Sequence, residues 1–456
     1  MRSKTRVDMC NGPLFRNIVV YTLPIIATSV LQLLFNTMDL LVVGRYCGST
    51  SVGAVGSTSA IINLLVNLFT GLSVGVSVTV AQGLGGNDRT RVEKAVHTAI
   101  PVAAMGGLLL TVIGLTCSRI FLEWMGNPAE TIDLATMYMR IYFCGTLGSL
   151  VYNFGAAILR AAGDTLRPLI FLSSAGILNV VLNVIFVRCF HMDVDGVALA
   201  TVISQYLSAG LVIVALMRRT DFCRLELKKI TLDRIALGRI LYIGLPAGVQ
   251  GSLFSISNVI IQSSVNSFGA AAVTGCAAAS NIEGYVYVCL NAFCQTTMNF
   301  TGQNVGAGKE ERVHRIVGIC LACVAVVGLS LSGLVCTFAR PLLSIYITDC
   351  AEAIEYGVTK LFCICLPYFM CGMMEVMTGT LRGMGSSIAS MFISVLGICG
   401  FRLVWIFTIF QIPAFHTLTW LFLSYIISWT GTFLVGLAVY FALQRSRKKK
   451  KEAVQV

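Results

Sequence analysis

Apolar runs long enough to cross a membrane recur along the whole chain, and they constrain its fold more than any other feature. Segments 170–187 and 319–338 contain no charged residue, and a helix needs roughly 20 residues to cross the hydrocarbon of a bilayer. Unbroken runs of this length favour helices over a barrel, because a helix satisfies its own backbone hydrogen bonds. We therefore predict an all-α integral membrane protein.

About twelve such runs lie between Asn17 and Leu443. Charged residues make up only 12% of the chain, against about 25% in a typical soluble domain, which agrees with this interpretation. The expected spans are 17–44, 52–82, 92–117, 133–159, 166–188, 196–217, 238–266, 272–303, 312–338, 354–381, 386–409 and 417–443.

The distribution of basic residues predicts how the chain is oriented. The net charge is +12, and 26 of the 33 Lys and Arg residues lie in the two termini and in the loops that follow every second span. This asymmetry follows the positive-inside rule. We expect a multi-pass protein of the cell membrane with both termini cytoplasmic. The basic segments then face anionic lipid headgroups rather than nucleic acid.

The second half of the chain repeats the first at a constant offset. Leu23-Pro24 returns as Leu245-Pro246, and Gly163 returns at the same offset as Gly385. Each half holds six expected spans, and because six is even, both halves enter the membrane in the same direction. Two parallel six-helix repeats are a recurrent plan of transporters, with the substrate path between the halves.

The repeat sets the predicted domain boundaries. A cytoplasmic N-terminus and a first six-helix lobe precede a basic cytoplasmic linker, and a second lobe and a basic cytoplasmic tail follow it. The corresponding ranges are 1–16, 17–217, 218–237, 238–443 and 444–456.

The cysteines and the glycine-rich corners do not indicate a cofactor. The 17 cysteines lie mostly inside apolar segments without ligand-like spacing, as small core residues do. The corners GLGGND at 83–88 and GAGKEE at 306–311 lack the Gly-Lys-Ser/Thr of a phosphate loop. They are typical of helix ends, which argues against an ATP-driven pump. We expect no cofactor, and a coupling ion, Na⁺ or H⁺, instead.

Four charged residues fall well inside the expected spans: Asp39, Glu283, Glu375 and Arg402. A charge at the bilayer centre costs roughly 2.5–3.5 kcal/mol on insertion scales, so such residues usually face a cavity and mark an ion or substrate path. Arg402 could pair with Glu283 or Glu375 as a structural latch. The alternative is a second proton site or a wall that attracts cations.

Asp39 shares its depth with several neutral polar side chains. Because a helix rises by a fixed amount per residue, Asp39 lies in the outer half of the first span, as do Asn179 and Asn183 in the fifth and Thr201 and Gln205 in the sixth. Such oxygen-rich groups suit Na⁺, while a lone desolvated carboxylate suits proton exchange. Alternatively, the Asn and Thr side chains only bridge packed helices. No other metal site is expected.

Several segments resemble the multidrug and toxic compound extrusion (MATE) transporters over essentially the whole chain. They include LPIIATSVLQLLFNTMDLLVVG (23–44), AQGLGGND (81–88), LRAAGDTLRP (159–168), LNVVLNVIFV (178–187), GLPAGVQGSLFSISN (244–258), GQNVGAGK (302–309) and LRGMGSS (381–387). The DinF-like bacterial branch is the most similar, because its acidic residue in the first span falls on Asp39.

The resemblance implies a V-shaped pair of six-helix lobes, alternating access, and export of amphipathic, often cationic small molecules in exchange for Na⁺ or H⁺. It implies an ion site at Asp39, Asn179, Asn183 and Thr201. Independently of the resemblance, their depth and charge lead us to expect a substrate cavity and a secondary charge network at Gln205, Glu283, Glu375 and Arg402. Some members carry a second acid at the position of Asn183, and another branch carries a glutamate in the seventh span, where Ser255–Asn258 has none. These departures argue against a two-carboxylate Na⁺ site and against coupling in the seventh span.

Two other functions stay open. A lipid-linked-precursor flippase of the same superfamily would line its cavity with several cations, whereas the sequence offers one clear intramembrane arginine. An integral-membrane enzyme would need a constellation such as His-Glu-x-x-His or an elbow serine, and the sequence contains neither. We expect a monomeric transporter rather than an enzyme.

Overall fold

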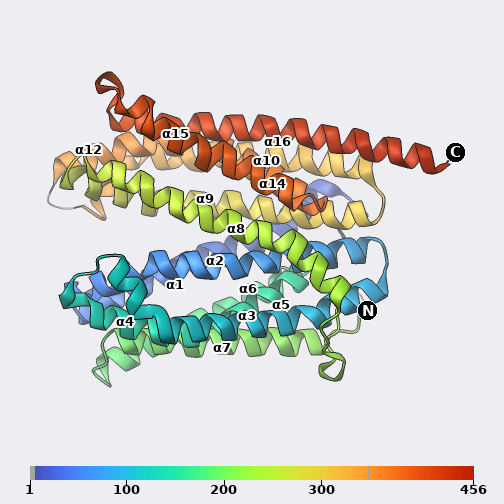
Figure 1. The fold of residues 1–456 in the computed structure, drawn as a ribbon, viewed down its shortest axis with the longest axis horizontal. Helices are drawn as coiled ribbons and strands as arrows, with labels where there is room; N and C mark the ends of the chain where they lie inside the picture. Colours follow the sequence, from blue (N-terminus) through green and yellow to red (C-terminus); the bar gives the residue numbers. More distant parts are fainter. Residues whose placement is uncertain (1–5, 348–349, 456) are drawn as a thin grey trace. The chain divides into compact units, whose positions relative to one another are not determined.

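The computed structural model describes residues 6–347 and 350–455, and the regular structure of these residues is entirely helical (Figure 1). Its α-helices are α1 (Leu14–Tyr46), α2 (Ser49–Gly85), α3 (Arg89–Trp124), α4 (Ala129–Cys144), α5 (Thr146–Ala161), α6 (Leu166–Arg188), α7 (Val194–Met217), α8 (Arg234–Asn266), α9 (Ala270–Gly306), α10 (Glu310–Thr337), α11 (Ala339–Ser344), α12 (Ala351–Lys360), α13 (Tyr368–Gly383), α14 (Ser387–Ser394), α15 (Phe401–Phe407) and α16 (Leu418–Gln455). Short 3₁₀ turns are η1 (Leu227–Lys229), η4 (Ile409–Gln411) and η5 (Pro413–Phe415), and two π-helical segments are η2 (Leu361–Cys365) and η3 (Val395–Gly400).

The predicted all-helical membrane fold is confirmed. Among the described residues, 9 helices are long and apolar enough to cross a membrane, and two bent helix pairs raise this to 11. The remaining expected span coincides with α9, a helix of 37 residues. α16 runs to Gln455, so the helix continues well beyond the expected end of the last span at 443.

Two expected spans are bent at equivalent places in the repeat. α4 and α5 meet at an angle of 44° at Gly145, and the helix formed by α12 and η2 meets α13 at 44° just before Tyr368. Pro367 explains the second bend, because proline removes a helical hydrogen bond and its ring clashes with the preceding turn. π-helical turns such as η2 are frequent at functional sites.

The chain separates into two compact units. The first holds Val19–Ser252, the described part of residues 1–12, and Gly306–Gly308; the second holds Pro13–Ile18, Leu253–Val305 and the described part of 309–456. By this criterion the division falls within α8, whereas the sequence places it in the linker 218–237. The predicted lobe boundaries remain a prediction.

The same packing pattern is found within each unit. In the first unit, α5 lies against α3 and α7; in the second, α13 lies against α10 and α16. α5 starts at Thr146 and α13 at Tyr368, and these two positions are separated by the offset of the repeat. The repeated sequence therefore folds into repeated structure, as expected.

Small residues allow the helices of the first unit to approach closely. A Cβ atom on Gly71 of α2 would lie 2.2 Å from the Cα atom of Gly248 in α8, and one on Gly107 of α3 would lie 2.5 Å from the Cα atom of Leu147 in α5. Helices in a lipid environment associate mainly through such close van der Waals packing rather than through a hydrophobic driving force.

Arginines from the two ends of the chain bind equivalent loops. Arg6 Nε donates to the carbonyl of Ala162 at 2.7 Å, and Arg447 Nη2 donates to the carbonyl of Met384 at 2.6 Å. The two carbonyls occupy matching positions of the repeat. In both loops the next residue is a glycine with positive φ, +86° and +83°, a conformation that L side chains rarely adopt.

An ionic network outside the membrane-spanning segments strengthens the first of these contacts. Arg6 Nη1 lies 2.7 Å from Asp221 Oδ2, and Arg219 Nη2 binds the same oxygen at 2.7 Å. Burial raises the pKa of Asp221, but the hydrogen bonds and charge of Arg219, with the charge of Arg6, outweigh it and lower the pKa overall. The start of the linker is therefore ionically tied to the N-terminal segment within the first unit.

Candidate functional site

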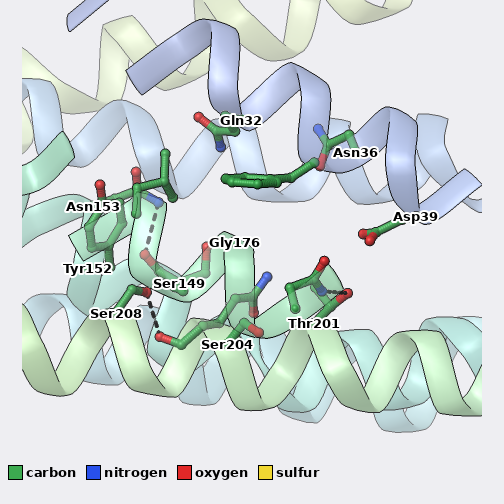
Figure 2. Close-up of a pocket in the computed structure, with 15 residues that line it drawn as sticks. Gln32, Asn36, Asp39, Ser149, Tyr152, Asn153, Gly176, Thr201, Ser204 and Ser208 are labelled. Atoms are coloured by element: carbon green, nitrogen blue, oxygen red, sulfur yellow. Dashed lines mark hydrogen bonds between the residues drawn. The ribbon is translucent and has the colours of Figure 1, made fainter. Parts of the chain in front are cut away.

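Four helices of the first unit surround a cavity of about 120 Å³. Each contributes residues spaced three or four apart, which share one helical face. The lining residues are Gln32, Phe35, Asn36 and Asp39 of α1, Ser149, Tyr152 and Asn153 of α5, Leu172, Ala175, Gly176 and Asn179 of α6, and Thr201, Ser204, Gln205 and Ser208 of α7. Figure 2 shows the α1 side chains facing those of α7 across this space.

Asp39 is held at one end of the cavity by a chain of neutral side chains. Asn183 Nδ2 donates to Asp39 Oδ1 at 2.6 Å and to Asn179 Oδ1 at 3.2 Å. Asn179 Nδ2 in turn donates to Thr201 Oγ1 at 3.2 Å. Asn183 is fully buried, and its Oδ1 atom has no hydrogen-bond partner among the described residues. The end of the cavity at Asp39 is therefore rich in oxygen acceptors.

The carboxylate of Asp39 has no fixed counter-charge. Every ion pair found among the described residues involves an acid other than Asp39. No Lys, Arg or His of the described residues therefore lies within 4.0 Å of its carboxylate. None of the residues that line the cavity is basic. The hydrogen bond from Asn183 stabilises the carboxylate in part, but its charge is not balanced by any cationic side chain that lines the cavity.

The structure thus brings together the residues that the sequence grouped by depth. Asp39, Asn179, Thr201 and Gln205 line the cavity. Asn183 is not a lining residue, but its amide donates to Asp39. Asn179 and Asn183 share a face of α6 because they are four residues apart. Their role in ion coupling remains a prediction.

Sequence reasoning missed much of the cavity wall. Gln32, Asn36, Ser149, Asn153, Ser204 and Ser208 all line it. The signal was present in the spacing: Gln32, Asn36 and Asp39 lie on one face of the first expected span, and Thr201, Ser204 and Ser208 lie on one face of the sixth. Gly176 also contributes, because a Cβ atom there would lie 1.9 Å from the ring of Phe35, another lining residue.

In the second unit, the pairing expected for Arg402 is not found. Glu283 Oε1 instead lies 3.2 Å from Nζ of Lys360, which also hydrogen-bonds to the hydroxyl of Ser280 and to the carbonyl of Cys276. Lys360 was overlooked as a buried cation although it lies inside the expected span 354–381. It is only 7% exposed.

Arg402 is buried against aromatic rings rather than against an acid. Its guanidinium carbon lies 3.7 Å from the ring centroid of Tyr425 and 5.6 Å from that of Trp429, and Nε donates to Ser428 Oγ at 3.1 Å. No ion pair of Arg402 is present in the described part of the chain. Cation–π contacts of this kind stabilise a guanidinium that is removed from water.

Glu375 is also buried, at 6% exposure. Its partners are the thiol of Cys294, through a hydrogen bond, and the positive charge of Arg382. Glu283, Glu375 and Arg402 therefore have three different sets of partners. The part of the chain that the structure describes contains no ion pair between Arg402 and either glutamate, so the expected structural latch is absent from it.

A family profile described as MatE matches residues 24–185 and 246–408. These matches cover most of the chain, and the second begins where the repeat places the counterpart of the first. The chain belongs to the MatE family. The resemblance to MATE transporters drawn from the sequence is thereby confirmed.

Curated relatives of this MatE protein match it over most of their length. It is 26% identical over 391 residues to the probable multidrug resistance protein YpnP of Bacillus subtilis, covering 85% of this chain and 87% of the relative. It is 24% identical over 396 residues to the probable multidrug resistance protein NorM of Thermotoga maritima, covering 85% and 84%.

Solved structures agree with the fold of the MatE protein. A multidrug resistance MATE family transporter of the MOP superfamily, solved in an outward-facing conformation, superposes with a TM-score of 0.89 at 21% identity, covering 99% of this chain and 100% of that one. A MOP superfamily transporter from Pyrococcus furiosus superposes with a TM-score of 0.88, covering 98% of each chain. At this level of identity the likeness concerns the fold alone.

Proposed function

We propose that this MatE protein is a secondary active exporter that expels small amphipathic, often cationic molecules in exchange for Na⁺ or H⁺ by alternating access. The curated relatives named as multidrug resistance proteins support this function. The positive-inside charge pattern supports a place in the cell membrane with both termini cytoplasmic.

One observation carries the proposal most directly. Asp39 lies at the end of a cavity, without a basic partner among the described residues, and is held by the neutral amide of Asn183. Because a carboxylate in this position is stabilised by a proton or a cation, its occupancy depends on the ion gradient. Competition between the coupling ion and a cationic substrate for Asp39 would then link the two movements.

The experiment uses purified full-length protein in proteoliposomes loaded with a panel of cationic dyes. A Na⁺ gradient and a pH gradient are imposed separately, with gradient-free vesicles as the control. We expect dye movement driven by at least one of the two gradients. Dye movement that does not depend on either gradient would contradict the proposal. Chemical conversion of a dye in the absence of a gradient would contradict it too.

A further inference from the structure

The wall of the cavity that α7 forms presents hydroxyl groups as hydrogen-bond acceptors, and this pattern bears on which cations the cavity accepts. Resting on the proposed export function, we infer that the cavity selects ammonium groups that carry N–H donors over permanently alkylated quaternary ammonium groups. The relevant surface is a stripe of three hydroxyls on α7, Thr201, Ser204 and Ser208, which faces α1 (Figure 2).

Each hydroxyl of the stripe already donates its only proton to a hydrogen bond within the protein. Ser204 Oγ donates to the carbonyl of Ala200 at 2.9 Å, and Ser208 Oγ donates to that of Gln205 at 2.8 Å. Thr201 Oγ1 donates to the carbonyl of Val197 at 3.0 Å and accepts from Asn179 Nδ2 at 3.2 Å, so one of its two lone pairs is already used. A hydroxyl has one proton and two lone pairs, so what these groups can still offer a ligand is lone pairs.

On the α5 wall, the hydroxyl of Tyr152 follows the same pattern, because it donates its one proton to the carbonyl of Pro168 at 3.1 Å. Asn153 Nδ2 donates one of its two protons to the carbonyl of Ser149 at 2.9 Å. The amides of Gln32 and Asn36 can turn either their oxygen or their nitrogen inward. They therefore adapt to a ligand, whereas the hydroxyls of α7 cannot donate without breaking a bond to their own helix.

The size of the cavity indicates which part of a ligand enters. The cavity has a volume of about 120 Å³. Pockets that enclose a drug-sized molecule measure roughly 300–1,000 Å³. In this conformation the cavity accommodates a headgroup, with the remainder of an amphipathic molecule outside it.

Charge alone does not distinguish the two kinds of cation. Asp39 attracts a protonated amine and a quaternary ammonium alike. The acceptors do distinguish them, because a protonated amine replaces the hydrogen bonds that water made to the lone pairs. A trimethylammonium group covers the same oxygens and leaves them unpaired, which weakens binding.

The test compares two ligands that differ only at nitrogen, 3-phenylpropylammonium and its N,N,N-trimethyl derivative. Binding to the purified full-length protein in nanodiscs is measured at pH 7 by displacement of a bound cationic dye. We expect the ammonium to bind about tenfold more tightly, the equivalent of about 1.4 kcal/mol. Equal binding, or tighter binding of the trimethyl compound, would overturn the inference.

A variant separates the hydroxyl stripe from general effects. Ser204→Ala combined with Ser208→Ala removes two acceptors and should reduce the preference several-fold. Ser174→Ala is the matched control, because Ser174 makes the same backbone bond, to Ile170 at 2.9 Å, but lies outside the cavity; it should leave the preference unchanged. An unchanged preference in the double variant counts against the inference.

The dye-panel experiment keeps the two proposals apart. Gradient-driven efflux together with equal binding of the two ligands refutes only the selectivity. Absence of gradient-driven efflux for every dye refutes the export function itself, whichever ligand binds more tightly.

Discussion

Asn183 Nδ2 donates to Asp39 Oδ1 at 2.6 Å across 144 residues of sequence. The bond ties α6 to α1 and joins the charge inside the first unit to a neutral amide. An amide orients a carboxylate without neutralising it, so the charge state of Asp39 stays free to follow the ion that reaches it.

Asp39→Asn should abolish gradient-driven dye efflux while leaving expression and folding intact. The substitution keeps the shape of the side chain and removes its ability to hold a proton or a metal cation. Some dye binding should remain, because the rest of the cavity is unchanged. Efflux from proteoliposomes and dye binding in detergent measure the two effects.

Asp133→Asn is the matched control for this experiment, because Asp133 is an exposed acid paired with Arg119 and lies outside the cavity. It should transport normally. Full gradient-driven efflux by Asp39→Asn would move attention to Glu283 and Glu375.

The identity of the coupling ion should be visible in the neighbours of Asp39. If Na⁺ binds there, Asn183→Ala and Thr201→Ala remove oxygen ligands and should weaken the Na⁺ dependence of efflux. If only protons are exchanged, the same changes should shift the pH optimum and Na⁺ should have no effect. Initial efflux rates over a matrix of Na⁺ concentration and pH separate the two results; rates identical to wild type throughout would remove both residues from the site.

Lys360→Met should destabilise the protein by about 3 kcal/mol or more, because it leaves the buried carboxylate of Glu283 without its partner. Adding Glu283→Gln should recover part of the loss, since the double variant has no orphaned charge. Thermal unfolding of the purified protein measures both effects. Additive losses in the double variant would show that the two residues do not act as a pair.

A surface pair provides the control for Lys360. Arg340 and Glu355 lie 2.9 Å apart with their side chains largely exposed, and exposed pairs contribute about 0–1 kcal/mol. Arg340→Gln should therefore change the unfolding temperature little. A loss as large as that of Lys360→Met would mean that burial is not the cause.

Gly71→Ala should destabilise the first unit, because the new Cβ atom would meet the backbone of Gly248 at 2.2 Å and α2 and α8 would have to move apart. Overpacking of this kind costs about 1–3 kcal/mol. Gly210→Ala in α7 meets no atom within 4 Å and should be neutral or slightly stabilising, since alanine favours a helix over glycine. Unfolding temperatures of the two variants make the comparison; equal effects would contradict the close crossing.

Much of the fold could be predicted from the sequence, because a bilayer gives the chain few choices. An uncharged run of span length, such as 319–338, satisfies its backbone only as a helix. The constant offset of the repeat then predicted that α5 and α13 would occupy equivalent positions in the two halves. The depth of Asp39 in its span was likewise readable, since a helix rises by a fixed amount per residue.

The partners of buried charges were decided only by the tertiary structure. Glu283 pairs with Lys360 and Arg402 stacks on Tyr425, whereas depth alone made Arg402 the natural partner of a glutamate. Depth fixes one coordinate of a side chain along the membrane normal. The lateral position of each helix and its rotation about its own axis fix the other two, and both depend on packing contacts between helices that are distant in sequence. Asp39 does lie beside its predicted neighbours, because α6 and α7 are rotated so that these residues face α1. The spacing of residues along each span could not predict this rotation.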